Sequence, residues 1–322
     1  MLAGYITATN VTLARVRERQ GQIHLYDKRS YISREFSDFD ALLGLYLRQI
    51  KAKPEEVVLG VAGPVIHHEV RTTNLPWHLA SSDLEKRFQF SRVRLVNDLV
   101  AAAHGLFFLD EGKFYTLNKG VPDRAGNLGL IAAGYGLGEA IITYDGARYR
   151  PFGSEGGHTG FAPANQDEVE LWEYIYGQQG YVEVEDVLSL PGIERLYRFA
   201  VERNRAVVAD WFKKSPDKPD AVIEKALSAS DDQAVEAMDI FIGCYARECA
   251  NLALKAMTLG GLHLVGLIAP RILTLLDQSR FIGSFVIEGK MKEVLSAIPV
   301  KVVLDANAAL VGAAAMAISH KQ

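Results

Sequence analysis

Cysteine is nearly absent from this chain of 322 residues. The two cysteines, Cys244 and Cys249, lie five residues apart in a segment with helical periodicity, which places their side chains on different parts of the helix surface. We therefore expect no disulfide between them, and two thiols are too few for a zinc site with four thiolate ligands. Both are expected to be buried as small hydrophobic residues in a reducing compartment.

Long apolar runs and an excess of basic charge are also missing. No stretch reaches the roughly 20 uninterrupted apolar residues that cross a membrane, and the first residues lack the basic start and apolar core of a signal peptide. The 35 basic and 39 acidic side chains give a net charge of -4, which provides no basic field for nucleic acid or an anionic membrane. These absences predict a cytoplasmic protein with neither kind of partner.

The chain does contain enough apolar residues and enough length for two packed domains. Hydrophobic residues make up 49% and charged residues 23% of it, the balance of a globular protein with a sizeable core. Hydrophobic periodicity of 2 or 3.6 residues predicts strands alternating with helices in both halves, and hence an α/β fold with two sheets. The expected strands are 2–8, 11–16, 23–32, 57–62, 93–96, 127–133, 140–144, 262–267 and 300–304. The expected helices are 39–50, 167–176, 193–203, 231–257 and 308–318.

Three local signals refine this outline. Gln20-Gly21 marks a hairpin turn between the second and third strands. Ser82 and Glu85 have the spacing of a capping box that opens a short helix. Segment 213–219, with two prolines and several charges, is expected to be a surface loop.

Asn97 and Asp98 directly follow an apolar strand. Polar side chains at the carboxyl end of a sheet strand lie where α/β proteins bind their ligands, and a carboxylate there can accept a proton from a substrate hydroxyl. The alternative is that one of the two residues only caps the following helix.

Two glycine-rich segments are further candidates. In Gly153–His158, glycines permit a sharp turn that exposes Glu155 and His158. A metal site there lacks a third ligand, so hydrogen bonds to a polyhydroxyl ligand are the better interpretation, and a simple connection is the other. The second segment, Gly134–Gly138, could let backbone N–H groups approach a phosphate, although tight hairpin turns also favour glycine.

Taken in order, these segments resemble the bacterial glucokinase family of the hexokinase-like superfamily, over essentially the whole chain. The residues that carry the resemblance are Gly63-Pro64, Thr73–Trp77, Val96–Asp98, Gly134–Gly138, Glu155–His158, Phe161–Pro163, Glu185, Val187–Ser189, Asn251–Leu254, Gly260-Gly261, Ala269–Arg271, Asn307 and Gly312. The resemblance implies an actin-like fold of two α/β domains with the ligand cleft between them. We place the small domain at 1–106 plus 305–322 and the large domain at 107–304.

The resemblance also implies roles for single residues. Asp98 matches the catalytic base that takes the proton of the glucose 6-hydroxyl. The residues that match hydrogen-bonding partners of the other sugar hydroxyls are Asn97, Glu155, His158 and Glu185. Carboxylates and an amide suit a neutral polyol, because each hydroxyl both donates and accepts. Glucose is therefore the expected ligand, and relatives lead us to expect a homodimer.

The segments that match the nucleotide site depart from the family pattern. Relatives begin with Asp-x-Gly-Gly-Thr-Asn, whose Asp helps position magnesium, whereas this chain has Tyr5, Thr7 and Ala8 at the Asp and Gly-Gly positions. A tyrosine cannot replace a carboxylate near magnesium, and Thr7 and Ala8 add Cβ atoms where the backbone approaches phosphate and where φ could need to be positive. Three further positions differ from the family pattern. Thr12 replaces an Arg of many relatives, and Tyr135 replaces a Thr that is usual in the second phosphate loop. Leu267 replaces the second glycine of a Gly-Gly pair that begins at Gly266. The residues that still match nucleotide contacts are Thr9, Asn10, Gly134, Gly136 and Gly266.

ATP and magnesium are the cofactors that the family implies, and no other metal is expected. Phosphoryl transfer depends on positioning and charge neutralisation, so changes clustered on the phosphate contacts favour a glucose-binding protein whose kinase activity is weak or lost. One alternative is a fully active glucokinase with a rearranged nucleotide site. The other is a regulatory or scaffold protein that closes on glucose and presents its altered surface to a partner.

Overall fold

A computed structural model describes residues 1–322 except 21, 73–74, 278 and 319–322. Gly21 of the expected hairpin turn and Thr73-Asn74 of the family resemblance therefore lie outside the described residues. The chain divides into two compact units. Unit 1 comprises Met1–Lys113, Pro151–Gly153 and Asp305–Gln322, and unit 2 comprises Phe114–Arg150 and Ser154–Leu304. Each unit is described by itself.

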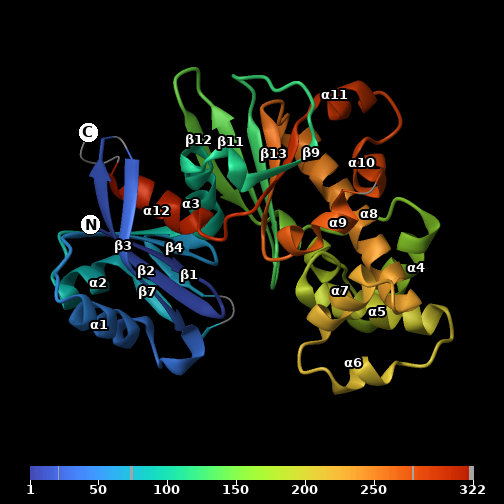
Figure 1. The fold of residues 1–322 in the computed structure, drawn as a ribbon, viewed down its shortest axis with the longest axis horizontal. Helices are drawn as coiled ribbons and strands as arrows, with labels where there is room; N and C mark the ends of the chain where they lie inside the picture. The colour runs from blue at the N-terminus through green and yellow to red at the C-terminus, as the bar shows by residue number, and fades with distance from the viewer. Residues whose placement is uncertain (21, 73–74, 278, 319–322) are drawn as a thin grey trace. The chain divides into compact units, whose positions relative to one another are not determined.

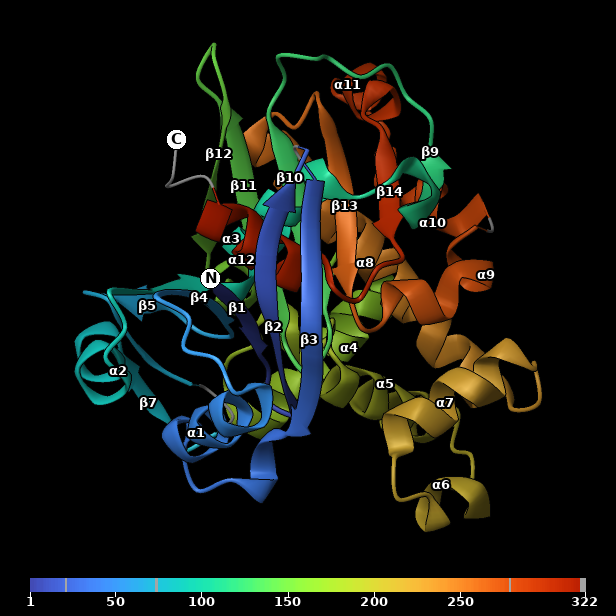
Figure 2. The same cartoon turned by 60° about the vertical axis from the view of Figure 1, so that its left-hand side comes forward.

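Unit 1 is built on a five-stranded sheet with the order β3-β2-β1-β4-β8. The central strand β1 pairs antiparallel with β2 and parallel with β4, which in turn is parallel to β8. Figure 2 shows the long pair β2 and β3 at one edge of this sheet. Its strands are β1 (Leu2–Ile6), β2 (Asn10–Arg19), β3 (Gln22–Ile32), β4 (Glu56–Val61) and β8 (Arg92–Asn97). A small second sheet contains β5 (Val65–Ile66), β6 (Glu69–Arg71) and β7 (His78–Ala80).

Helices supply the apolar partners of the unit 1 sheet. The helices are α1 (Phe39–Ile50), α2 (Ser81–Phe88), α3 (Asp98–Gly105) and α12 (Ala308–Ile318), with short 3-10 turns at Ser33–Glu35, Leu106–Phe108 and Glu111–Lys113. One cluster of buried residues joins Leu42, Leu43 and Tyr46 of α1 to Leu2, Leu13 and Leu59 of the sheet. A second joins Leu310, Ala313 and Ala314 of α12 to Ala3, Ala14 and Val58. The small side chains of α12 let its backbone approach the sheet closely.

Unit 2 is built on a six-stranded sheet with the order β12-β11-β10-β13-β14-β9. Strands β10, β13 and β14 are parallel, so their carboxyl ends share one edge. The strands are β9 (Phe114–Asn118), β10 (Leu128–Ala133), β11 (Leu137–Tyr144), β12 (Tyr149–Ser154), β13 (Gly261–Gly266) and β14 (Val300–Val303). The helices are α4 (Gln166–Gln179), α5 (Leu190–Arg203), α6 (Asp210–Lys214), α7 (Lys218–Leu227), α8 (Asp232–Ala256), α9 (Leu273–Leu276), α10 (Ser279–Phe285) and α11 (Lys292–Ala297). Short 3-10 turns lie at Gly156–His158, Val184–Asp186 and Ala269–Ile272.

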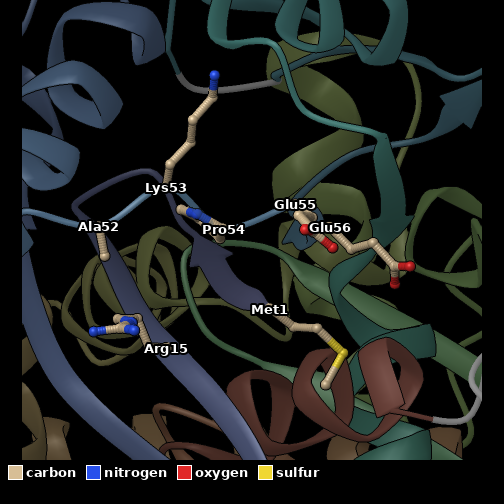
Figure 3. A pocket seen from close by; sticks show the side chains of 7 residues that line it. All are labelled: Met1, Arg15, Ala52, Lys53, Pro54, Glu55 and Glu56. Atoms are coloured by element: carbon tan, nitrogen blue, oxygen red, sulfur yellow. The ribbon is translucent and has the colours of Figure 1, made fainter.

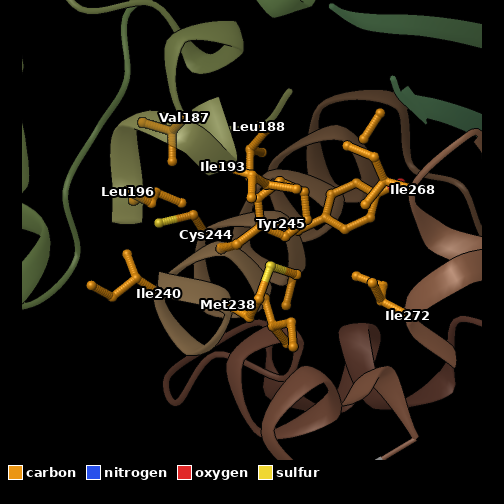
Figure 4. Packing of buried hydrophobic residues seen from close by; sticks show 14 of the residues in the cluster. Val187, Leu188, Ile193, Leu196, Met238, Ile240, Cys244, Tyr245, Ile268 and Ile272 are labelled. Atoms are coloured by element: carbon orange, nitrogen blue, oxygen red, sulfur yellow. The ribbon is translucent and has the colours of Figure 1, made fainter. Parts of the chain in front are cut away.

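The long helix α8 is the centre of the unit 2 core, and it contacts α5, α7 and α10 (Figure 1). Figure 4 shows Cys244 and Tyr245 of α8 among Leu188, Ile193 and Ile268. Cys244 and Cys249 are both buried and free, as expected from the sequence. Burial raises the pKa of both thiols, so they remain protonated and inert at neutral pH.

Two local predictions were wrong. Helix α2 begins at Ser81 with Ala80 at its N-cap, and no side chain caps it. The carboxylate of Glu85 instead accepts a hydrogen bond from the Val93 backbone N–H, at 2.8 Å. Segment 213–219 is not one loop, because it contains the end of α6 and the start of α7, with Pro219 in the first turn of α7. Proline is favoured there because the first helical N–H groups have no partner within the helix.

Of the helices in the described ranges, none combines the length and apolar character that crossing a bilayer requires.

Candidate functional site

Asn97 and Asp98 of unit 1 join the end of β8 to the start of α3. The Asn97 Oδ1 accepts hydrogen bonds from the backbone N–H groups of Leu99, at 3.0 Å, and Val100, at 3.3 Å. Its Nδ2 donates to the Gly63 carbonyl at 3.2 Å. Asn97 is therefore the N-cap of α3, as the capping interpretation predicted, and one N–H of its amide is left over for a ligand.

Close backbone packing fixes the helix that begins at Asp98. A Cβ atom at Gly312 of α12 would overlap the Ala101 carbonyl of α3, and one at Gly105 of α3 would overlap the Ala308 carbonyl of α12. Figure 2 shows α12 alongside α3. These two glycines bring the helix backbones into contact, so α3 and the carboxylate at its first residue have little freedom to shift.

Tyr5 of β1 lies close to Asp98, because β1, β4 and β8 are adjacent parallel strands. Burial, and next the negative charge of Asp98, raise the pKa of the Tyr5 phenol above its ordinary value of 10.0. The phenol is therefore neutral at physiological pH. At the position where relatives carry an aspartate, unit 1 presents no anionic oxygen.

The turn from Thr7 to Asn10 uses its polar groups within itself. Thr7 N donates to the Asn10 carbonyl at 2.8 Å, and Asn10 N donates to Thr7 Oγ1 at 3.0 Å. Asn10 Nδ2 donates to Thr9 Oγ1 at 3.0 Å. The expectation that a positive φ could be needed here is wrong, because neither Thr7 nor Ala8 adopts one. The Thr7 hydroxyl instead closes the turn, through its hydrogen bonds with the backbone of Asn10.

In unit 2, the segment Glu155–His158 rests directly on β11. A Cβ at Gly157 would overlap the Leu137 carbonyl, and one at Gly156 would overlap the carboxylate of Glu139. The two glycines are buried, whereas Glu155 and His158 on either side of them are exposed. The loop is thus held flat against the sheet by its glycines and directs its two functional side chains away from it, as the sequence pattern predicted.

His158 is oriented by a residue that the sequence analysis did not select. Its Nδ1 lies 2.8 Å from Glu183 Oε2. This hydrogen bond, and next the charges of Glu185, Glu183 and Glu155, raise the pKa of His158 against the opposing effect of burial. Because Glu183 accepts from Nδ1, the Nε2 atom is left for a ligand. In the sequence, Glu183 is recognisable only as a carboxylate two residues before Glu185. Spacing alone does not connect it to His158.

Glu185 is tied to the turn between β10 and β11. Its Oε2 accepts a hydrogen bond from the Leu137 backbone N–H at 2.7 Å, and a Cβ at Gly136 would overlap the same carboxylate. Leu137 therefore contacts two predicted sugar-binding segments, Glu185 through its N–H and the Gly157 backbone through its carbonyl. Unit 2 brings Glu155, His158 and Glu185 to one end of β11.

The predicted phosphate residues of unit 2 lie at the carboxyl ends of β10 and β13. Gly266 has a φ of 91° and lies against Ala133, where a Cβ would not fit. The backbone N–H groups of Gly134 and Leu267 donate to the carbonyls of Gly136 and Ala133. Gly134 and Gly136 do not adopt positive φ, so the turn is not formed by left-handed glycines.

The turns that match the nucleotide site use some of their backbone donors within the fold. Four N–H groups at the ends of these turns, those of Thr7, Asn10, Gly134 and Leu137, already have acceptors there. The side chains of Tyr135 and Leu267 are 47% and 48% exposed beside this edge of the sheet, where they occupy the approach to the turn. Among the described residues, no group of three His, Cys, Asp or Glu side chains could hold a metal ion.

A pocket in unit 1 contains none of the predicted residues. Figure 3 shows its lining, which is made by Met1, Arg15 and Ala52–Glu56. Its acidic and basic side chains are those of an ordinary polar surface hollow.

Glu139 and Glu248 form a second feature that the sequence analysis missed. Both side chains are buried although both are acidic. In the sequence, Glu139 is recognisable only as an acidic residue in an otherwise apolar strand. The strand pattern does not relate it to Glu248, which lies on a helix far along the chain.

Comparison with known proteins gives one consistent answer. A protein-family model described as Glucokinase matches residues 2–320. A glucokinase of Nostoc sp. is 34% identical over 98% of this chain and 97% of its own length, and one of Shigella dysenteriae is 29% identical over 98% and 95%. A crystal structure of glucokinase from an Antarctic psychrotroph matches with a TM-score of 0.85 at 27% identity, covering 100% of this chain and 98% of the other. The structure of a Balamuthia mandrillaris glucokinase in complex with glucose matches with a TM-score of 0.83 at 21% identity, covering 98% and 92%.

Proposed function

The chain belongs to the glucokinase family, and from that premise we propose that it binds glucose and phosphorylates it with ATP only weakly or not at all. Glucose phosphorylation is the reaction to which membership of this family points. We propose both the low rate of glucose phosphorylation by this chain and the roles of its individual residues.

The sugar side supports the proposal because its polar groups are presented and positioned. Glu155 and His158 project from a loop held by buried glycines, and Glu185 is anchored by Leu137 N. Asp98, which we assign as the group that accepts the hydroxyl proton, begins a helix capped by Asn97. Two of the similar proteins are described as glucokinases in complex with glucose.

The single observation that carries the slow-transfer half of the proposal is that four backbone N–H groups of the two turns, those of Thr7, Asn10, Gly134 and Leu137, already have acceptors inside the fold. A backbone N–H that already has an acceptor must break that bond before it can stabilise a phosphate oxygen. Loss of one such preorganised donor typically slows a reaction by about 100- to 1000-fold. The neutral Tyr5 phenol adds to this loss, because it does not supply the anionic oxygen that attracts magnesium.

Calorimetric titration tests the binding half. We expect glucose to bind the purified chain and Glu155→Gln to weaken that binding by roughly 10- to 100-fold, because a hydrogen bond to a charged group contributes about 1.5–3 kcal/mol. Glu288→Gln is the matched control, since it makes the same change on an exposed side chain of unit 2 and should leave the affinity unchanged.

Two outcomes would contradict this half of the proposal. One is a wild-type chain that shows no heat with glucose, and the other is a Glu155→Gln variant that binds like the wild type. A parallel titration with MgATP should give little or no binding. Tight MgATP binding would favour the active glucokinase with a rearranged nucleotide site. A cytoplasmic location and a homodimer complete the proposal, the latter testable by light scattering of the same samples.

A further inference from the structure

Two buried glutamates lie directly beneath the proposed sugar-binding loop in unit 2. Glu139 is on β11 and Glu248 is on α8, and their relative exposures are only 5% and 6%. An isolated ionised carboxylate is costly to bury, so a buried acid normally has a charged partner or keeps its proton. The partners of this pair decide which of the two applies.

The negative charge of Glu248 acts directly on Glu139, so the two carboxyl groups lie near each other. The Oε1 atoms of Glu139 and Glu248 are both buried, and no donor among the described residues reaches either of them. A proton held between the two carboxyls gives these orphaned oxygens a partner, because two carboxylates can form a hydrogen bond only if one of them is protonated. The remaining contacts are weak counterweights: Asn251 Nδ2 donates to Glu248 Oε2 at 2.9 Å, and the exposed Lys255 Nζ lies 3.9 Å from Glu248 Oε1.

The other carboxylate oxygen of Glu139 lies against the loop. It is Oε2 that a Cβ at Gly156 would overlap, next to the point where Gly157 rests on the Leu137 carbonyl. Residues 137–139 of β11 are thus the surface on which the loop lies. A change in the position or hydration of the Glu139 carboxyl must act on Gly156, which is the residue directly after Glu155.

We propose that Glu139 and Glu248 are positioning residues for sugar binding: one proton shared between their carboxyls holds the loop Glu155–His158 flat on β11. This inference rests on the proposed glucose site, and it adds to that site a supporting pair that does not touch the sugar. When the shared proton is lost, two negative charges face each other beneath the loop. Water must then enter, and Gly156 is displaced.

The electrostatic surroundings agree with a shared proton. Burial, and next the negative charge of Glu248, raise the pKa of Glu139 to about 8, and Lys255 opposes this only partly. The buried Cys249 thiol of α8 also faces the pair, and burial and the charges of Glu248 and Glu139 raise its pKa. On β10 the residue opposite Glu139 is the apolar Ile131. On the outer side of the loop, the side chains of His158 and Glu155 are exposed.

The test compares glucose affinity at pH 7 and pH 9 in the wild type and in Glu139→Gln, with Glu248→Gln as a second variant. Glutamine keeps the size and supplies an N–H in place of the shared proton, so it cannot ionise. We expect the wild-type Kd to rise by about tenfold between these values of pH, since one pKa unit corresponds to a tenfold change. The Kd of Glu139→Gln should change less than twofold. His158 titrates in both proteins, so its contribution cancels from the comparison.

Hydrogen exchange of segment 155–159 without sugar separates this inference from the proposed function. At pH 9 this segment should exchange faster in the wild type than in Glu139→Gln, whereas at pH 7 the two proteins should exchange at the same rate. This result does not depend on whether the protein binds glucose. Two results would overturn the proposal. One is a difference in exchange rate between the wild type and Glu139→Gln that is the same at pH 7 and pH 9. The other is a Kd for glucose that depends on pH equally in the wild type and in both glutamine variants. Failure of all proteins to bind glucose, with the exchange difference present, would instead contradict only the proposed function.

Discussion

At the residue scale, the sugar-side groups owe their geometry to neighbours that do not reach the ligand. His158 is held by Glu183, Glu185 by Leu137 N, and Asn97 divides its side chain between α3 and Gly63. In the proposed site, His158 Nε2, Glu185 Oε1 and one N–H of the Asn97 amide then remain for sugar hydroxyls. A site of this kind is preorganised, so little of the binding free energy is lost in ordering the side chains.

The anchor of His158 gives a prediction on its ionisation. Glu183→Gln replaces the charged acceptor that is the principal cause of the raised pKa of His158 by a neutral amide oxygen, so this pKa should fall toward the ordinary value of about 6.5. The pair of His158 and Glu183 contributes fully to the stability of the folded state at pH values below the ordinary pKa of histidine. That contribution is lost as the pH rises through the raised pKa of His158. Titration of the ring C–H resonances by NMR measures the shift, with the other histidines as internal references. A His158 resonance with an unchanged midpoint would show that Glu183 does not hold the ring.

Single residues also mark the limit of what could be predicted from the sequence. A cap at Asn97 or Asp98 was one of two interpretations available from the sequence, because a strand, two polar residues and an apolar helix follow one another locally, and the structure assigns it to Asn97. Glu139 was missed because its partner Glu248 is brought to it only by the packing of α8 on the sheet. Tertiary pairing of two acids leaves no local signal, whereas a cap depends on the next three residues.

At the scale of elements, the helices and strands with strong periodicity were predicted well and the short ones were not. Helix α12, an alanine-rich segment, has the predicted bounds Ala308–Ile318. The capping box at Ser82 failed because it requires a helix that starts at Asp83, and α2 starts two residues earlier, at Ser81. Segment 213–219, with the end of α6 and the start of α7, was read as a loop because its prolines and charges suggest a turn, although proline in a first turn is compatible with a helix.

Contact between helix backbones gives a prediction at this scale. Gly312→Ala should destabilise the protein by about 1–3 kcal/mol, because its Cβ would overlap the Ala101 carbonyl and the two helices would have to separate. Gly177→Ala is the matched control: it makes the same change inside α4 with nothing within 4 Å, and it should be neutral or stabilising by up to about 1 kcal/mol. Urea unfolding of both variants measures the difference. Equal stability of the two would show that α3 and α12 do not rely on close packing.

At the scale of the whole molecule, the fold class and the family were predictable, because motifs along the entire chain kept their order and spacing. The two sheets of the expected α/β fold are present, together with a small third one. What the sequence did not reveal is how the altered turns are satisfied. Substitutions such as Thr7 for glycine looked like strain, yet the structure accommodates Thr7 without a positive φ and uses its hydroxyl to close the turn.

The division between sugar and phosphate groups is the central claim at this scale. Each segment of the proposed sugar site is supported by neighbours within its own unit, while both turns of the proposed phosphate site use their end N–H groups internally. We propose on this basis that the protein recognises glucose but transfers phosphate to it slowly. Turnover is therefore a sharper test than binding of glucose alone.

The most direct measurement is a coupled assay of glucose 6-phosphate formation at saturating glucose and MgATP. Kinases of this chemistry turn over about 1–100 times per second, and the loss of even one preorganised phosphate contact lowers that rate by about 100-fold or more. The account predicts a kcat below roughly 0.1 per second in a protein that binds glucose. A kcat within the ordinary kinase range would contradict it and establish a working glucokinase with a rearranged nucleotide site.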